Sequence, residues 1–314
     1  MSLPASTENV PSSLLHVNFC GISFQNPLIL ASGILGTSGA LLKKAASSGL
    51  GGVTTKSVGP RPRYGYLNPS VIEIGPGTCL NAVGLANPGI MEFVSEIPAA
   101  KASGVPIIMS VFGSSGEEYK RVAMAAQDAG VDAIEMNISC PHAKVSSIGA
   151  SAKLTHDTVS TVKNSVKIPI FVKLNPNVTN LIEIGMAAED GGADAVVAIN
   201  TIRGMAIDIH ARKPILFNQS GGVSGKSIKP MAVKAVFDLY KALSIPVIGC
   251  GGIFSAEDVV EFMLAGASAV QLGTVFMHGW EIVDSIKHGL IAYCNQYSIP
   301  SIGKIIGKAH EEVV

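Results

Sequence analysis

Eight short apolar runs recur along the chain, and each is separated from the next by a stretch long enough for a helix. The runs cover residues 28–32, 53–57, 107–112, 133–138, 170–174, 195–200, 247–250 and 269–272. Strands that alternate with helices are typical of a parallel sheet. Prolines directly precede the odd-numbered runs, and glycines stand shortly before the even-numbered ones. This fourfold repeat of a double unit favours a closed barrel over an open doubly wound sheet, so we predict an α/β fold of the TIM (β/α)8 type.

The separating stretches carry recognisable helix starts. Ser115 with Glu118 and Asn180 with Glu183 have capping-box spacing, in which each side chain satisfies a backbone N–H group of the first helical turn. Pro230 suits a first helical turn, and Ser255 stands three residues before Asp258. We therefore expect helices to begin at these positions.

The remaining segments lie outside this alternation of predicted strands and helices. Residues 1–13 are predicted to be a disordered lead, residues 14–314 a single barrel domain, and residues 16–24 a small hairpin at its start. Three connections are unusually long: residues 58–86 after strand two, 141–154 after strand four and 202–229 after strand six. Long loops at one rim of a barrel usually cover a ligand, so these three are expected to border the site.

The composition narrows the class of ligand. The chain has 23 basic and 23 acidic residues, so it has no excess of basic residues for nucleic-acid binding. No apolar run approaches the length of a membrane span and no signal peptide is visible, which predicts a cytoplasmic protein without a membrane segment. The five cysteines are scattered and form no Cys-x-x-Cys pair, which argues against disulfides, structural zinc and an iron-sulfur cluster. Redox chemistry would need a bound organic cofactor, and no metal site is expected.

Polar or glycine residues end every predicted strand, where TIM barrels build their active sites. Lys56 and Lys173 would enter the same rim and favour an anionic ligand or an electron-rich ring. Asn81, Asn137 and Asn200 add neutral donors and acceptors that suit a planar ring with amide edges. Cys140 is the only evident proton acceptor at the strand ends, and it would act as a thiolate.

Two glycine motifs close strands seven and eight. Gly251-Gly252 and Gly273-Thr274 stand where TIM barrels often bind phosphate, although tight packing of helix on strand is the alternative interpretation. Residues 220–227 (SGGVSGKS) do not form a nucleotide P-loop, because Ser220 replaces the required glycine. No G-x-G-x-x-G follows a strand, so a Rossmann nicotinamide site is absent from the sequence.

Several motifs together resemble class 1 dihydroorotate dehydrogenases. In chain order they are NAVGLANPG (81–89), NISCP (137–141), VKLNPNVT (172–179), AINT (198–201), PILFNQSGGVSGKSIKP (214–230), IGCGGI (248–253) and AVQLGT (269–274). The resemblance extends from Pro27 to Val275. The long connection after strand six is most similar to that of the class 1B catalytic subunit. That subunit passes electrons to NAD through a separate subunit carrying FAD and an iron-sulfur cluster.

The resemblance implies an FMN cofactor and a set of site residues. Contacts with FMN are expected from Ser32, Lys56, Ser57, Ser110, Asn137, Lys173, Ile199, Gly225, Gly251, Gly252, Gly273 and Thr274. Contacts with dihydroorotate or orotate are expected from Lys56, Asn81, Ala82, Val83, Gly84, Leu85, Asn137, His142, Asn200 and Thr201. Cys140 is the implied base, with Lys56 and Lys173 as the other catalytic residues. A homodimer is the implied assembly, extended to a heterotetramer if the electron-transfer subunit binds.

Two positions depart from the family pattern. Ser110 stands where many class 1B members have Asn, and His142 stands where the family usually has an Asn that touches the substrate. The flavin domain of dihydropyrimidine dehydrogenase has a His after the same Ser-Cys-Pro sequence. The expected activity is FMN-dependent oxidation of dihydroorotate to orotate in pyrimidine biosynthesis. The alternatives are a dihydrouracil-type pyrimidine oxidoreductase and a barrel that binds a phosphate ligand without turning it over.

Overall fold

The computed structural model describes residues 13–139 and 148–311 of the chain. Three features predicted from the sequence lie wholly or partly outside these residues. They are the lead over residues 1–13, the two residues Cys140 and His142, and the first half (141–147) of the connection after strand four.

Eight parallel strands close into a barrel, which confirms the predicted TIM fold. Its members are β3 (Leu28–Leu30), β4 (Gly52–Thr54), β7 (Ile107–Val111), β8 (Ala133–Asn137), β9 (Ile170–Lys173), β10 (Ala195–Ala198), β15 (Val247–Cys250) and β16 (Ala267–Leu272). Every neighbouring pair in the ring is parallel. The strands are almost entirely buried because side chains fill the barrel on one face and helices cover the other. The eighth strand begins at Ala267, two residues earlier than predicted.

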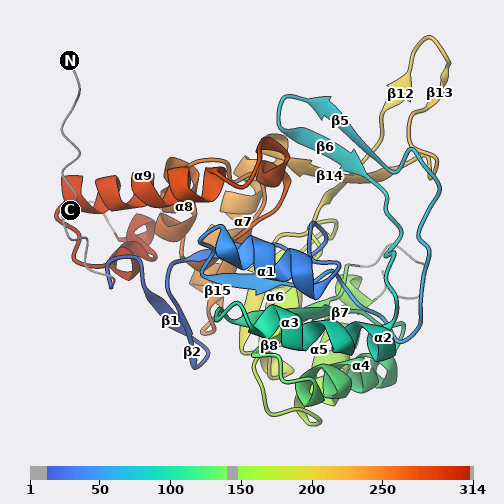
Figure 1. Cartoon of the computed structure of the whole chain (residues 1–314), viewed down its shortest axis with the longest axis horizontal. Coiled ribbons are helices and arrows are strands. Elements are labelled where there is room, and N and C mark those ends of the chain that lie inside the picture. The colour runs from blue at the N-terminus through green and yellow to red at the C-terminus, as the bar shows by residue number, and fades with distance from the viewer. Residues whose placement is uncertain (1–12, 140–147, 312–314) are drawn as a thin grey trace.

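Helices follow the barrel strands and are grouped around them (Figure 1). The α-helices are α1 (Gly39–Ser47), α2 (Ile90–Phe93), α3 (Ile97–Lys101), α4 (Gly116–Asp128), α5 (Ala152–Lys163), α6 (Leu181–Asp190), α7 (Lys229–Ala242), α8 (Ala256–Leu264) and α9 (Ile282–Gln296). The 3-10 helices are η1 (Val94–Glu96), η2 (Ile148–Ala150), η3 (Lys226–Ile228), η4 (Thr274–His278), η5 (Ile302–Ile305) and η6 (Lys308–His310). Among the described residues, no helix is both long and apolar enough to span a membrane.

The predicted helix starts are confirmed. The side chains of Ser115, Asn180 and Ser255 accept hydrogen bonds from the third residue of α4, α6 and α8 respectively. At α8 the cap is reciprocal, because Asp258 also accepts from the backbone of Ser255. Pro230 lies in the first turn of α7, where its missing N–H group costs no helical hydrogen bond.

The predicted N-terminal hairpin is present as β1 (Val17–Phe19) and β2 (Ile22–Phe24), which pair antiparallel. Its turn residues Cys20 and Gly21 both have positive φ angles, of 52° and 73°. Phe19 stacks on Phe24 with ring centroids 4.8 Å apart and lies 6.0 Å from Phe171 of β9. The hairpin thus packs its aromatic side against the barrel.

The connections after strands two and six are long, as predicted, but they contain strands that the sequence did not reveal. A four-stranded sheet has the order β11 (Ile202–Gly204), β14 (Gly221–Gly225), β6 (Thr78–Asn81) and β5 (Val71–Gly75). Its central pair, β14 with β6, joins two connections that are far apart in the chain. A second hairpin, β12 (Ile207–Asp208) with β13 (Lys213–Pro214), extends from the same region, and Figure 1 shows these strands standing out on one side of the molecule.

Candidate active site

A cavity of about 820 Å³ opens at the carboxyl ends of the barrel strands, where the sequence predicted the site. The four-stranded sheet contributes to its wall through Val71, Cys79, Asn81, Gly221, Gly222, Ser224 and Gly225. The cavity is lined by Ser32, Lys56, Ser57, Asn81, Ala82, Val83, Gly84, Leu85, Asn137, Lys173, Ile199, Asn200, Thr201, Gly225, Gly251, Gly252, Gly273 and Thr274. The structure therefore brings together every predicted site residue that it describes, except Ser110.

Lys173 ends β9 and is 3% exposed, so its ammonium group sits in an almost dry environment. Its Nζ donates to Oε1 of Gln271 at 2.7 Å and lies 3.4 Å from Oγ of Ser32. Gln271, on β16, donates in turn from Nε2 to Oε2 of Glu135 at 2.5 Å. This chain of contacts links a cation at the cavity to a carboxylate deeper in the barrel.

Glu135 is fully buried on β8, and within the described residues its Oε1 atom has no hydrogen-bond partner. Burial alone would lower the pKa of Lys173, but the neighbouring Cys250 and Glu135 outweigh burial and raise it. Burial raises the pKa of the Cys250 thiol, with Lys173 opposing that shift. At neutral pH we therefore assign an ammonium to Lys173.

Lys56 follows β4, and its side chain reaches across to Gly33, which follows the neighbouring strand β3. Its Nζ donates to the carbonyl oxygen of Gly33 at 3.1 Å, and burial lowers its pKa. In the described part of the chain no carboxylate is bonded to Lys56. Lys173, in contrast, is linked to the Glu135 carboxylate through Gln271. A positive charge that lacks a protein anion favours an anionic ligand in the cavity.

A chain of polar side chains runs around the rim from β7 to β10. Ser110 and Ser57 bond through their hydroxyl groups at 2.9 Å, and Asn137 Nδ2 donates to Ser57 Oγ at 3.0 Å. Asn200 Nδ2 then donates to Asn137 Oδ1 at 3.2 Å. Ser110 is fully buried behind Ser57 and does not line the cavity, so it acts on the site through Ser57 in this structure.

The segment from Asn81 to Leu85 is held against the long connection after strand six. Asn81 Nδ2 donates to the carbonyl oxygen of Gly222 at 3.1 Å across the β6–β14 pair. A Cβ atom on Gly222 would overlap the Thr201 side chain, which shows how closely that side chain approaches the backbone of Gly222. The predicted substrate residues from both connections thus share one end of the cavity.

Gly225, at the end of β14, and Gly252, after β15, pack against one another. Gly252 has a φ angle of 76°, and a Cβ atom there would lie 2.7 Å from Cβ of Lys229 and 2.9 Å from the carbonyl oxygen of Gly225. Gly225 itself has a φ angle of 92°. These glycines leave backbone exposed to the cavity, and Ser224 is joined to Thr274 by a hydrogen bond of 2.9 Å. Exposed backbone N–H groups at such a rim suit a phosphate group.

Several functional residues were missed by sequence reasoning. Gln271 and Glu135 connect to Lys173, and the signal that could have revealed them is a polar residue at an inward position of an otherwise apolar strand. Asn177 and Arg203 line the cavity from the connections after β9 and β10. Within residues 13–139 and 148–311, no cluster of three or more His, Cys, Asp or Glu side chains could hold a metal ion.

The fold and the cavity define a TIM-barrel enzyme whose site offers two lysines, several amides and a glycine-rich rim. The family model described as "Dihydroorotate dehydrogenase" matches residues 14–293. The chain therefore belongs to the dihydroorotate dehydrogenase family, whose members are oxidoreductases.

Individual relatives agree with this assignment. The chain is 48% identical over 305 residues to "Dihydroorotate dehydrogenase B (NAD(+)), catalytic subunit" of Methanocaldococcus jannaschii, covering 95% of this chain and 99% of the relative. Proteins of the same name from Methanosarcina acetivorans (49% identity, covering 94% of this chain and 96% of the relative) and Pyrococcus horikoshii (47%, covering 94% and 98%) are similar. The resemblance to class 1B catalytic subunits is thus confirmed.

A solved structure supports the fold alone. The crystal structure of DHODH in complex with ferulenol from Eimeria tenella has a TM-score of 0.84 to this chain at 20% identity. The match covers 99% of this chain and 92% of the other.

Proposed function

We propose that the chain catalyses the FMN-dependent oxidation of dihydroorotate to orotate in pyrimidine biosynthesis. The observation that carries the proposal is the convergence of Lys56, Asn137, Asn200 and the Asn81–Leu85 segment on one cavity with Lys173. These groups supply positive charge for a carboxylate and amide edges for a pyrimidine ring. The names of the curated relatives support the same activity.

The residues present fit FMN. The glycine rim at Gly225, Gly251 and Gly252 offers backbone N–H groups to a phosphate, and side chains larger than hydrogen at Gly252 would collide with Lys229. Lys173, Ser57 and Asn137 offer donors to the polar edge of a flavin ring. When bound, FMN would supply the acceptor for a hydride from the substrate.

The protein's own residues would carry out the proton chemistry and the orientation. The Cys140 thiolate would take the proton from C5 of dihydroorotate, while the C6–H bond gives its electron pair and hydrogen to the cofactor and the C5–C6 double bond forms. Cys140 lies outside the described residues, so this role rests on its place after β8. Asn137 and Asn200, joined by their 3.2 Å hydrogen bond, would hold the pyrimidine ring in register.

Electrons would leave through a partner. We propose a homodimer that binds an electron-transfer subunit with FAD and an iron-sulfur cluster, which then reduces NAD. The relatives are named as the catalytic subunit of an NAD-linked enzyme, which supports a separate electron-transfer subunit.

The decisive experiment is anaerobic bleaching. We expect the purified protein to be yellow with about one FMN per chain, and to lose its flavin absorbance when dihydroorotate is added. A yellow protein that dihydroorotate leaves oxidised but dihydrouracil bleaches would replace our substrate with the second pyrimidine. A protein that neither substrate bleaches would favour a non-catalytic phosphate-binding barrel.

His142 is the residue that keeps the dihydrouracil alternative open, and it too lies outside the described residues. If His142 replaces the usual Asn as a hydrogen-bond donor to orotate, His142→Asn should change kcat/KM for dihydroorotate by no more than about tenfold, the worth of one neutral hydrogen bond. A wild-type preference for dihydrouracil that His142→Asn reverses would contradict our substrate assignment.

A further inference from the structure

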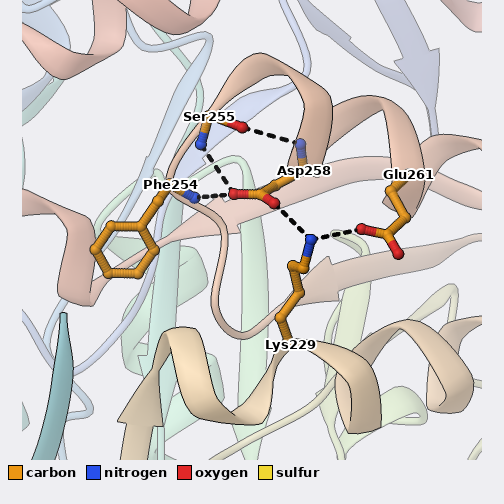
Figure 2. Close-up of polar contacts among 5 residues, drawn as sticks. All are labelled: Lys229, Phe254, Ser255, Asp258 and Glu261. Carbon is orange, nitrogen blue, oxygen red and sulfur yellow. Dashed lines mark hydrogen bonds and ion pairs between the residues drawn. The ribbon is translucent and has the colours of Figure 1, made fainter. Parts of the chain in front are cut away.

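An ion-pair cluster joins the start of α7 to the first two turns of α8 (Figure 2). Nζ of Lys229, the first residue of α7, donates to Oδ1 of Asp258 and to Oε2 of Glu261, both at 2.7 Å. The other oxygen of Asp258 accepts from the backbone N–H groups of Phe254 at 2.8 Å and Ser255 at 3.0 Å. One carboxylate thus holds a lysine from one helix and the backbone that leads into the other.

The segments that the cluster joins both line the cavity. Gly225 and Ile228 precede α7, Gly251 to Phe254 precede α8, and both sets face the same space. Lys229 also packs directly on Gly252, whose Cβ position lies 2.7 Å from Cβ of Lys229. A change in the spacing of the two helix starts would therefore move the backbone of the rim.

Lys229 does not itself serve as a free phosphate ligand. Its ammonium group already has two carboxylate partners, and Asp258 is only 15% exposed. The hydrogen bonds that Lys229 donates to Asp258 and Glu261 raise its pKa, so it stays charged across the neutral range. Its neighbour Lys226 lies over the Phe254 ring at 5.1 Å, which adds a second contact between the same two segments.

We propose that Lys229, Asp258 and Glu261 form a positioning cluster that fixes the spacing of the two glycine segments and so sets the affinity of the cavity for the phosphate group of its ligand. The inference rests on the proposed function, in which that ligand is FMN. The cluster acts by preorganisation: N–H groups already held at the right spacing need no ordering when the phosphate binds.

Comparison of FMN with riboflavin isolates the phosphate, because the two flavins differ only in that group. Dissociation constants would be measured by flavin fluorescence on apoprotein prepared from the full chain. We expect Lys229→Met, which keeps the aliphatic stem on Gly252, to weaken FMN binding about tenfold and to change riboflavin binding less than about twofold. Lys229→Arg can still reach both carboxylates and should retain most of the FMN affinity.

A second variant separates positioning from simple charge. Asp258→Asn removes a negative charge, so a purely electrostatic effect would tighten FMN binding, whereas loss of positioning would weaken it. We expect weakening, again with riboflavin nearly unchanged. The matched control is Lys234→Met, which removes an exposed lysine that pairs with Asp238 within α7 and should leave both flavin affinities unchanged.

Two results would overturn the inference. Lys229→Met and Asp258→Asn proteins that keep the wild-type ratio of FMN to riboflavin affinity would show that the cluster only holds the helices together. Tighter FMN binding by Asp258→Asn would assign the effect to net charge. Failure of the proposed function looks different: a wild-type apoprotein that binds FMN no more tightly than riboflavin would remove the phosphate assignment and the cluster's role together.

Discussion

Lys173 and Glu135 form a charge pair inside the barrel, although Gln271 stands between them. Both side chains are at most 3% exposed, and Oε1 of Glu135 has no hydrogen-bond partner in the part of the chain that the structure describes. Two charges that share a dry interior depend on each other, since either one alone would lack a counter-charge. The pair explains how a lysine can stay charged so deep in the cavity.

Removal of the lysine alone should therefore be costly to the fold. We expect Lys173→Met to lower the free energy of unfolding of the apoprotein by about 3 kcal/mol, because it leaves Glu135 buried without a cation. The double variant Lys173→Met with Glu135→Gln should recover about half of that loss, since no buried charge remains. Urea denaturation at pH 7 would measure both, and a double variant no more stable than the single would contradict the pairing.

Cys140 carries the proposed proton transfer, and its replacement tests that role. Cys140→Ser should slow flavin reduction by dihydroorotate by about 10²-fold or more, because a hydroxyl is a far weaker acid than a thiol and less able to become the base. FMN binding should survive. In the wild type the rate should rise with pH as the thiol, with an unperturbed pKa near ~8.5, becomes the thiolate. Reduction of the variant at close to the wild-type rate across the pH range would refute the assignment.

At the scale of elements, the four-stranded sheet determines where the substrate residues stand. Its β6–β14 pair brings Asn81 beside Gly222, and the side chain of Thr201, which follows β10 in the same connection as Gly222, lies against that glycine. The sheet therefore joins two segments that the barrel strands alone would leave independent. Its glycines are places of close approach between backbones and side chains.

Gly222→Ala should disturb the substrate end of the cavity without removing the cofactor. The added methyl group would overlap Thr201, and we expect kcat/KM for dihydroorotate to fall about tenfold or more while FMN affinity stays unchanged. The control is Gly75→Ala at the end of β5, where a Cβ atom has nothing within 4 Å. Steady-state kinetics and flavin titration would be compared, and equal kinetics for the two variants would count against the sheet's role.

At the scale of the whole molecule, we expect the chain to need a partner to pass electrons to NAD. The five cysteines of the sequence are scattered, and Cys20, Cys79, Cys250 and Cys294 are all free in the structure. We expect the pure chain to reduce an artificial dye with dihydroorotate but not NAD, because no cysteine cluster or nicotinamide motif is present in the sequence. Addition of an FAD and iron-sulfur subunit should restore NAD reduction. Robust NAD reduction by the chain alone would contradict the proposal that a separate subunit transfers the electrons to NAD.

Local patterns determined much of the architecture. The apolar runs predicted all eight barrel strands, and Ser115, Asn180 and Ser255 marked three helix starts correctly. These signals are readable because strand burial and helix capping depend on residues only a few positions apart. Of the site residues that were predicted from the sequence and that the structure describes, all except Ser110 line the cavity. The roles of Cys140 and His142 stay predictions.

Contacts between distant segments were decided only by the tertiary structure. The β6–β14 pair consists of two short strands, of which β14 is rich in glycine, and neither carries an alternating apolar pattern to reveal it. The position of Ser110 behind Ser57 and the link from Lys173 through Gln271 to Glu135 depend on how strands far apart in sequence meet inside the barrel. The sequence by itself determined the barrel and its polar rim, because those follow from local periodicity. The folded chain decided which polar groups satisfy one another, because buried charges and hydrogen bonds are paired in space and not along the sequence.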